Sequence, residues 1–228
     1  MRLELNSHRT RHGRREHLPR HLHKAPYTAL VLSGRYVEAG DTGRHIVEAG
    51  HVIRHAAFES HLNRFEDAPA EVLVLTAAAD DREFLGAVSD PDRIARLAER
   101  DVRAALACLD EQFLPRRHEP SDWPELLAQS LLADPGLSLR EWARRQKLHP
   151  GSLSRGFWHQ FGVTPARFKT LVKFHNARRL MSSRLRLAEI AVASGFADQP
   201  HLCREVRRSS GLTASTMVAR LRSSHRTD

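Results

Sequence analysis

The 228-residue sequence predicts an α+β protein, with a small antiparallel β-barrel followed by an all-α domain that carries two helix-turn-helix motifs. Three observations predict this fold class. Short β-rich runs fill residues 27–76, helical periodicity replaces them after Asp80, and one residue pattern occurs twice in the last part of the chain. A hydrophobic content of 41% is enough for packed cores in one large or two small domains.

The first part of the chain divides into a basic segment and a series of short strands. Residues 1–24 are rich in Arg and His with little periodicity, which predicts a largely mobile arm. Turn signals such as Gly40-Asp41-Thr42-Gly43 then separate six β-rich runs, a pattern typical of a small barrel or sandwich. The expected strands are Tyr27–Ser33, Arg35–Glu38, Arg44–Glu48, Val52–His55, His61–Phe65 and Glu71–Thr76.

A helical segment follows the strands. Apolar residues recur at helical spacing from Pro91 to Phe113, which predicts an amphipathic connector or a dimerisation helix. Leu114 to Pro120 form a polar, proline-bounded linker. We therefore expect three parts: a β-rich domain with its basic arm over residues 1–80, a helical connector over 81–120, and a DNA-binding domain over 121–228.

The last part of the chain contains the repeated pattern. Each copy has a short helix, a tight turn and a second helix, and the two copies are offset by 49 residues. Ser121, Ser138 and Asp198 are predicted helix N-caps, and Gly162 is a predicted C-cap. A long helix from Thr164-Pro165 lies between the copies and would set their separation. The positions related by the offset include Leu153 and Leu202, Phe157 and Val206, Gly162 and Gly211, and Thr164 and Thr213.

The basic excess lies in the same part of the chain as the repeat. Residues 121–228 contain 18 Lys and Arg against 8 Asp and Glu, a net charge of +10, whereas residues 1–120 have a net charge of −1. A solvated basic surface is the alternative, but its coincidence with two helix-turn-helix patterns favours binding to a polyanion.

The second helix of each motif is the candidate for reading base sequence in the major groove. Arg pairs with guanine and Gln with adenine, each contributing roughly 1–3 kcal/mol of discrimination. Lys173 is a candidate for phosphate contact, and Arg155 and Arg204 could instead be surface residues paired with a local carboxylate. The residues predicted to face DNA are Gly151, Ser152, Ser154, Arg155 and His159 in the first motif, and Gln199, His201, Cys203, Arg204 and Arg208 in the second.

From about Leu139 to Arg222 the chain resembles the double helix-turn-helix domain of AraC/XylS-type transcription regulators. Residues that carry the resemblance include Leu153-Ser154-Arg155, Thr164-Pro165, Ala177-Arg178-Arg179-Leu180 and Ala188-Glu189-Ile190-Ala191. The resemblance implies two reading helices in successive major grooves of double-stranded promoter DNA, with RNA polymerase as a further partner. It also implies a β-rich domain that senses a small-molecule effector or forms a homodimer. The chain departs from the family pattern at Leu202 and Val206, where aromatic residues are usual, and at Ala214, where proline is usual.

The β-rich part resembles a compact cupin. His21-Leu22-His23 matches the first cupin motif, and the interval from Gly50 to His61 matches the second. His21, His23 and His61 are therefore predicted to bind one divalent metal ion, which could be Zn, Fe, Ni or Mn, with His55 or Tyr27 as further ligands. The alternative is exposed histidines without a ligand, because the chain has 15 of them and the usual acidic ligand is not at its expected place.

Three functions are consistent with these patterns. A sequence-specific, non-enzymatic transcription regulator is favoured over a metal-dependent cupin enzyme with a DNA-binding tail, because no general acid or base is placed beside the histidines. A non-specific architectural DNA binder is the third. Two distant cysteines, Cys108 and Cys203, exclude a disulfide framework and a Cys-based zinc finger. With no long apolar run and no secretory signal, we expect a soluble cytoplasmic protein that does not contact membranes.

Overall fold

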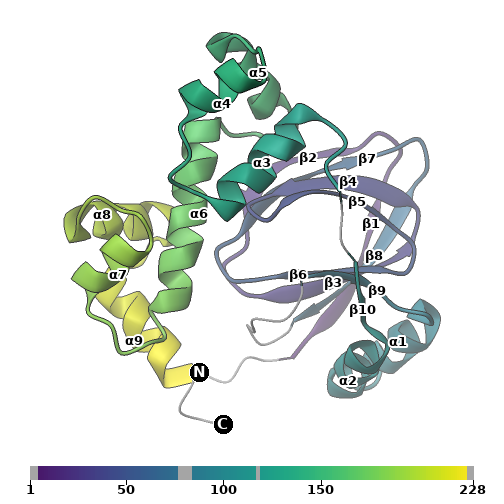
Figure 1. Ribbon diagram of the computed structural model, residues 1–228. Coiled ribbons are helices and arrows are strands. Elements are labelled where there is room, and N and C mark those ends of the chain that lie inside the picture. Colours follow the sequence, from purple (N-terminus) through teal and green to yellow (C-terminus); the bar gives the residue numbers. More distant parts are fainter. Residues whose placement is uncertain (1–4, 77–83, 117–118, 225–228) are drawn as a thin grey trace. The chain divides into compact units, whose positions relative to one another are not determined.

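The computed structural model describes residues 5–76, 84–116 and 119–224 (Figure 1). Contacts divide the chain into two compact units, Met1–Glu119 and Pro120–Asp228. The boundary predicted between residues 80 and 81 lies outside the described residues. Within the described residues, no helix combines the length and the apolar character that crossing a membrane requires.

The first unit contains two antiparallel sheets. One has the strand order β1-β8-β3-β6-β9-β10 and the other has the order β2-β7-β4-β5. The α+β class with an antiparallel β domain is thus confirmed, with the strands arranged in two sheets. The strands are β1 (Ser7–His12), β2 (His17–Leu22), β3 (Tyr27–Ser33), β4 (Arg35–Gly40), β5 (Gly43–Glu48), β6 (His51–His55), β7 (Ser60–Phe65), β8 (Ala70–Thr76), β9 (Leu85–Ala87) and β10 (Leu114–Pro115).

The prediction that the basic N-terminal segment is a mobile arm is wrong over β1 and β2, which are strands. β1 pairs with β8 and β2 pairs with β7, so both segments complete sheet edges. Both strands contain partly buried side chains, such as Thr10 in β1 and Arg20 in β2, and His12 stacks on Phe65 with ring centroids 4.2 Å apart. Arg9 forms ion pairs with Glu71 and Glu99 at 3.3 and 2.7 Å. These partners lie far along the chain, so local composition gave no sign of the pairing.

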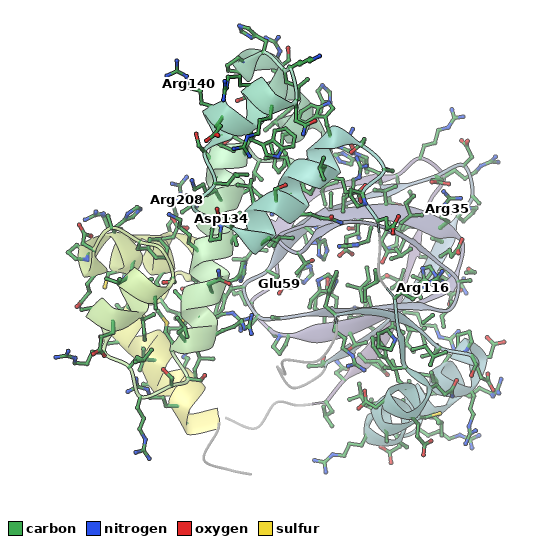
Figure 2. The ribbon with its side chains drawn as sticks, in the orientation of Figure 1. Arg35, Glu59, Arg116, Asp134, Arg140 and Arg208 are labelled. Carbon is green, nitrogen blue, oxygen red and sulfur yellow. The ribbon has the colours of Figure 1, made fainter. Side chains whose placement is uncertain are left out.

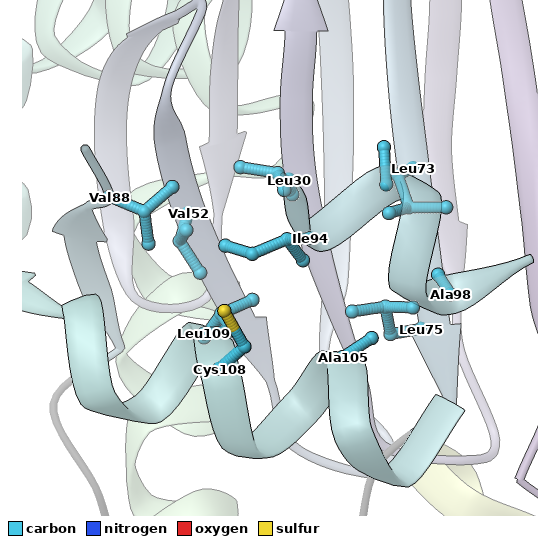
Figure 3. Packing of buried hydrophobic residues seen from close by; sticks show 11 residues of the cluster. Leu30, Val52, Leu73, Leu75, Val88, Ile94, Ala98, Ala105, Cys108 and Leu109 are labelled. Atoms are coloured by element: carbon cyan, nitrogen blue, oxygen red, sulfur yellow. The ribbon is translucent and has the colours of Figure 1, made fainter. Parts of the chain in front are cut away.

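Two helices, rather than the single helix expected over residues 91–113, follow the strands. Asp101 separates α1 (Pro91–Ala98) from α2 (Val102–Gln112), because its carboxylate accepts hydrogen bonds from the backbone N–H groups of Arg103 and Ala104. Their apolar sides pack on the larger sheet (Figure 3). The predicted connector is therefore part of the first unit, and its apolar stripe is covered by that unit's own sheet. The buried cluster includes Leu30, Val52, Leu73, Leu75, Ile94, Ala98, Ala105 and Leu109.

The second unit is helical throughout the described residues (Figure 1). Ser138, Asp198 and Gly162 occupy the predicted cap positions, whereas α3 is capped by Asp122 and not by Ser121. The Asp122 carboxylate accepts from the backbone N–H of Glu125 at 3.2 Å. The helices are α3 (Trp123–Ala133), α4 (Leu139–Arg145), α5 (Pro150–Phe161), α6 (Pro165–Leu180), α7 (Leu187–Ala193), α8 (Gln199–Ser210) and α9 (Ala214–Ser224).

Candidate functional site

The sequence repeat is also a structural repeat. α4 and α7 each have 7 residues, and α5 and α8 each have 12. α5 ends at Gly162 and α8 ends at Gly211, both in the left-handed conformation with φ of 67° and 73°, which an L side chain rarely adopts. Glycine at the same place in each copy thus stops each second helix after the same number of turns.

The inner edges of α5 and α8 are fully packed. Leu153, Phe157 and Phe161 are buried in the first motif, and Leu202 and Val206 are buried in the second. Because the buried residues recur every three or four positions, the intervening residues form an outward face on each helix. The residues on this face that are exposed are Ser152, Ser154, Arg155 and His159 on α5, and Gln199, His201, Arg204 and Arg208 on α8, whereas Gly151 and Cys203 are half-buried.

The two arginines that occupy related positions are available to a ligand. Within the described ranges, neither Arg155 nor Arg204 has an ion-pair or hydrogen-bond partner for its guanidinium, so neither is a surface arginine held by a local carboxylate. Arg208 on α8 and Arg140 on α4 add exposed positive charge to the second unit (Figure 2). This arrangement suits hydrogen bonds to base edges and phosphates.

Trp158 was not among the predicted residues but lies on the outward side of α5. Its side chain is 55% exposed, although tryptophan is usually well buried. It follows Ser154 by four positions and Arg155 by three, which places all three on one side of the helix. The signal was present in the sequence, because Trp158 falls outside the Leu153–Phe157–Phe161 spacing of the buried edge.

Lys173, predicted to contact phosphate, is hydrogen-bonded within the second unit. Its ammonium donates a hydrogen bond to the carbonyl of Gly195, in the turn of the second motif, at 2.6 Å. Burial, with the neighbouring Lys169, lowers the pKa of Lys173. Lys169 in turn donates to the carbonyls of Gly136 and Leu137 at 3.1 and 2.8 Å. Both lysines of α6 therefore hold neighbouring segments in place, a role that depends on contacts more than 20 residues away in sequence.

A third group on α6 ties this helix to α8. The Arg167 guanidinium donates to Glu205 at 2.5 Å and to the Ser209 hydroxyl at 2.9 Å, and the Ser209 hydroxyl donates to Glu205 at 2.5 Å. The Glu205 side chain is only 6% exposed. This network fixes how α8 lies along α6, and hence where its outward face points.

In the first unit, the predicted metal ligands come together with groups that were not in the predicted set. His21 and His61 belong to β2 and β7 of the smaller sheet and pair in register. His55 and Tyr27 pair on β6 and β3 of the larger sheet. Their side chains meet, with ring centroids of His21 and His61 4.6 Å apart and those of His55 and His61 also 4.6 Å apart. The cluster therefore draws on both sheets.

Glu38 is a buried carboxylate of this cluster. Gly40 pairs with His61, and Glu38 lies two residues earlier on β4, so it faces the same side of the sheet. A Cβ at Gly40 would lie 3.0 Å from the Cβ of His61, so the absence of a side chain leaves room for the imidazole. Sequence reasoning missed Glu38 because only the register of β4 against β7 places it there.

Burial sets the protonation of these groups. It raises the pKa of Glu38 to about 6, although His55 opposes the shift. It lowers the pKa of His23 to about 4, with help from His21 and His55, and it lowers the pKa of His61 well below its usual range. For His55, burial alone would lower the pKa, but Glu38 and Glu59 outweigh it and the net shift is upward. His23 and His61 are thus neutral imidazoles at neutral pH, the form that binds metal ions.

Comparisons with known proteins agree with the geometry of the second unit. Residues 142–220 match the family described as "Helix-turn-helix domain". No match was found among curated protein sequences.

Similar solved structures include fatty-acid-bound ToxT from Vibrio cholerae, at 11% identity over 95% of both chains with a TM-score of 0.43. A probable AraC family transcriptional regulator from Rhodopseudomonas palustris is 19% identical over 42% of this chain and 94% of its own, with a TM-score of 0.40. The DNA-binding domain of AdpA in complex with a target DNA is 21% identical over 47% of this chain and 100% of its own, with a TM-score of 0.44. Residues 142–220 are therefore a helix-turn-helix domain, as predicted for this part of the chain.

Proposed function

We propose that this chain is a sequence-specific transcription regulator that inserts α5 and α8 into successive major grooves of promoter DNA. The observation that carries the proposal is the repeat itself. Arg155 and Arg204 are 49 residues apart, occupy equivalent positions on helices of equal length, and are exposed without a partner in the described part of the chain. A helix-turn-helix with a bare arginine on its second helix is suited to pairing with guanine.

The outward residues divide into two roles under this proposal. Those on α5 and α8 read base edges, including Gln199 and the arginines. Exposed basic residues beside them contact phosphates, and we assign this role to Lys147, which precedes α5, and to Arg207 on α8. Lys173 is not among them, because its ammonium is engaged by the Gly195 carbonyl.

Competition binding tests the proposal. The intact protein should prefer fragments from the region upstream of its own gene, or sites selected from a random pool, over bulk DNA by a factor of ~10³ or more. Fluorescence anisotropy at fixed salt measures the ratio, because affinity for any DNA changes steeply with salt. Equal affinity for selected and random sequences would contradict sequence reading and favour an architectural DNA binder.

Under this proposal the first unit binds a small-molecule effector or forms a homodimer. RNA polymerase is the expected protein partner at the promoter. The packing of α1 and α2 on their own sheet directs a dimerisation test to other surfaces of this unit. Light scattering of the intact chain gives its mass in solution. Footprinting with and without RNA polymerase then shows whether the two proteins occupy the promoter together.

A further inference from the structure

Two sets of possible metal ligands lie in the first unit and have His61 in common. One is the set predicted from sequence, His21, His23 and His61, of which the first two are half-buried. The other is Glu38, His55 and His61, and all three are buried. In each set the candidate ligand atoms lie within 4.8 Å of one another. Because His61 belongs to both, the two sets compete for it.

The spacing in the buried set fits a coordinated ion. Glu38 Oε1 lies 3.4 Å from His55 Nε2 and 3.8 Å from His61 Nδ1. Both separations exceed the usual length of an N–H···O hydrogen bond. Two ligands that each lie about 2.1 Å from a tetrahedral ion are roughly 3.4 Å apart. The Glu38 oxygen therefore lies close to the distance from each nitrogen that two ligands of one ion would have, and all three ligand atoms lie within 4.8 Å of one another.

The two imidazole nitrogens nearest to Glu38 make no hydrogen bond within the described residues. His55 Nε2 and His61 Nδ1 are buried and have no hydrogen-bond partner among the residues the structure describes. Their side chains are only 3% and 4% exposed. Buried polar atoms are nearly always hydrogen-bonded, and a metal ion shared with the nearby Glu38 carboxylate would satisfy both nitrogens.

The other side of each ring is supported. His55 Nδ1 faces the Glu59 carboxylate at 3.6 Å, and the Tyr27 hydroxyl lies 3.4 Å from His61 Nε2. A proton on Nδ1 of His55, attracted by Glu59, leaves a lone pair on Nε2 that points toward the Glu38 oxygen. Either a proton or a metal ion between this nitrogen and the carboxylate removes their repulsion, so a metal ion that binds here takes the place of the proton. A second partner that fixes the tautomer is the usual environment of a metal-bound histidine.

We propose that Glu38, His55 and His61 bind one divalent transition-metal ion, and that His21 is not one of its ligands. His21 hydrogen-bonds to the Pro19 carbonyl through Nδ1 at 2.9 Å and is half-buried, at the periphery of the cluster. His23, whose Nε2 is buried without a partner in the described residues, is the nearest further imidazole, with its ring 4.9 Å from that of His61. Two imidazoles and one carboxylate suit Zn, Fe, Ni, Co or Mn better than Ca or Mg.

Metal titration of the untagged full-length protein tests this proposal independently of DNA binding. After removal of metal with a chelator, Co²⁺ is added and followed by its visible absorption, and Zn²⁺ is then used to displace it. We expect one Co²⁺ per chain. Glu38→Gln and His55→Gln should each weaken binding by more than about 100-fold, beyond the loss usual for a supporting residue. His21→Gln, the matched control, should leave the affinity unchanged.

Two results would overturn the proposal: no stoichiometric binding of Co²⁺ or Zn²⁺ by the wild-type chain, or loss of binding in His21→Gln while Glu38→Gln keeps it. The second would return the site to the set predicted from sequence. Circular dichroism and thermal melting of the metal-free variants show whether they fold. If Glu38→Gln does not fold, His55→Gln, which keeps the carboxylate, replaces it in the comparison with His21→Gln. Metal binding by His55→Gln together with its loss in His21→Gln would then overturn the proposal.

Discussion

The two helix-turn-helix motifs have the same backbone plan but different interiors. In the first, Phe157, Phe161 and Phe168 form an aromatic cluster, with ring centroids 4.4 to 5.4 Å apart. In the second, the smaller Leu202 and Val206 fill the equivalent edge, and both are fully buried. A charged network between Arg167 and Glu205 lies beside them and connects α8 to α6.

This difference shows that α5 and α8 are positioned by different forces. The first motif depends on buried apolar area, which stabilises without strong directional preference. The second has less aromatic area and adds short, directional bonds that hold α8 at one angle. Leu202 and Val206, which depart from the family pattern, are nevertheless fully buried.

The largest expected effect is on the first motif. Phe157→Ala removes a fully buried ring from the aromatic cluster and should lower the free energy of unfolding of the second unit by about 3–5 kcal/mol. Tryptophan fluorescence follows unfolding in denaturant, because Trp123, Trp142 and Trp158 all lie in the second unit. Val192→Ala, at a position that is 71% exposed, is the control and should change little. A loss as small as the control's would show that the aromatic cluster does not stabilise this motif.

In the second motif, Glu205→Gln should cost roughly 2–3 kcal/mol, somewhat less than the loss of a partner in a fully buried pair. The reason for the reduction is that the Arg167 side chain keeps 22% exposure and can be partly hydrated. Replacing Arg167 by Met as well removes the uncompensated charge, so the double variant should be more stable than Glu205→Gln alone. Chemical denaturation of Glu205→Gln, Arg167→Met and the double variant measures the coupling. Additive losses would mean that the pair does not act as a unit.

The next largest effect is on the preference of the protein for particular DNA sequences. Arg155→Ala should reduce the preference for selected over random DNA by about 1–3 kcal/mol and relax base choice in one half-site. Arg204→Ala should do the same in the other half-site, to a comparable extent if both motifs read sequence equally. Binding-site selection with each variant reports which positions lose their preference. If either variant weakens binding to selected and random DNA equally, its arginine contacts phosphates instead.

Local signals in the sequence were sufficient for part of this structure. The repeat, the Gly162 cap and six strands follow from periodicity and turn residues, which act over a few positions. What could not be predicted depends on pairing between distant segments. β1 pairs with β8 and β2 pairs with β7. The register of β4 against β7 places Glu38 beside the histidines. Lys173 donates a hydrogen bond to the Gly195 carbonyl in the second motif.

The smallest effect separates the two possible roles of a lysine on α6. Lys173→Met removes the hydrogen bond to the Gly195 carbonyl but keeps most of the aliphatic stem, so it should cost about 1 kcal/mol of stability. The dependence of DNA affinity on salt should stay the same, because this ammonium is already occupied. Lys147→Met, which removes an exposed charge beside α5, should instead reduce the salt slope by about 1. A reduced slope for Lys173→Met, with unchanged stability, would restore its predicted role as a phosphate contact and would mean that the ammonium leaves Gly195 when DNA binds.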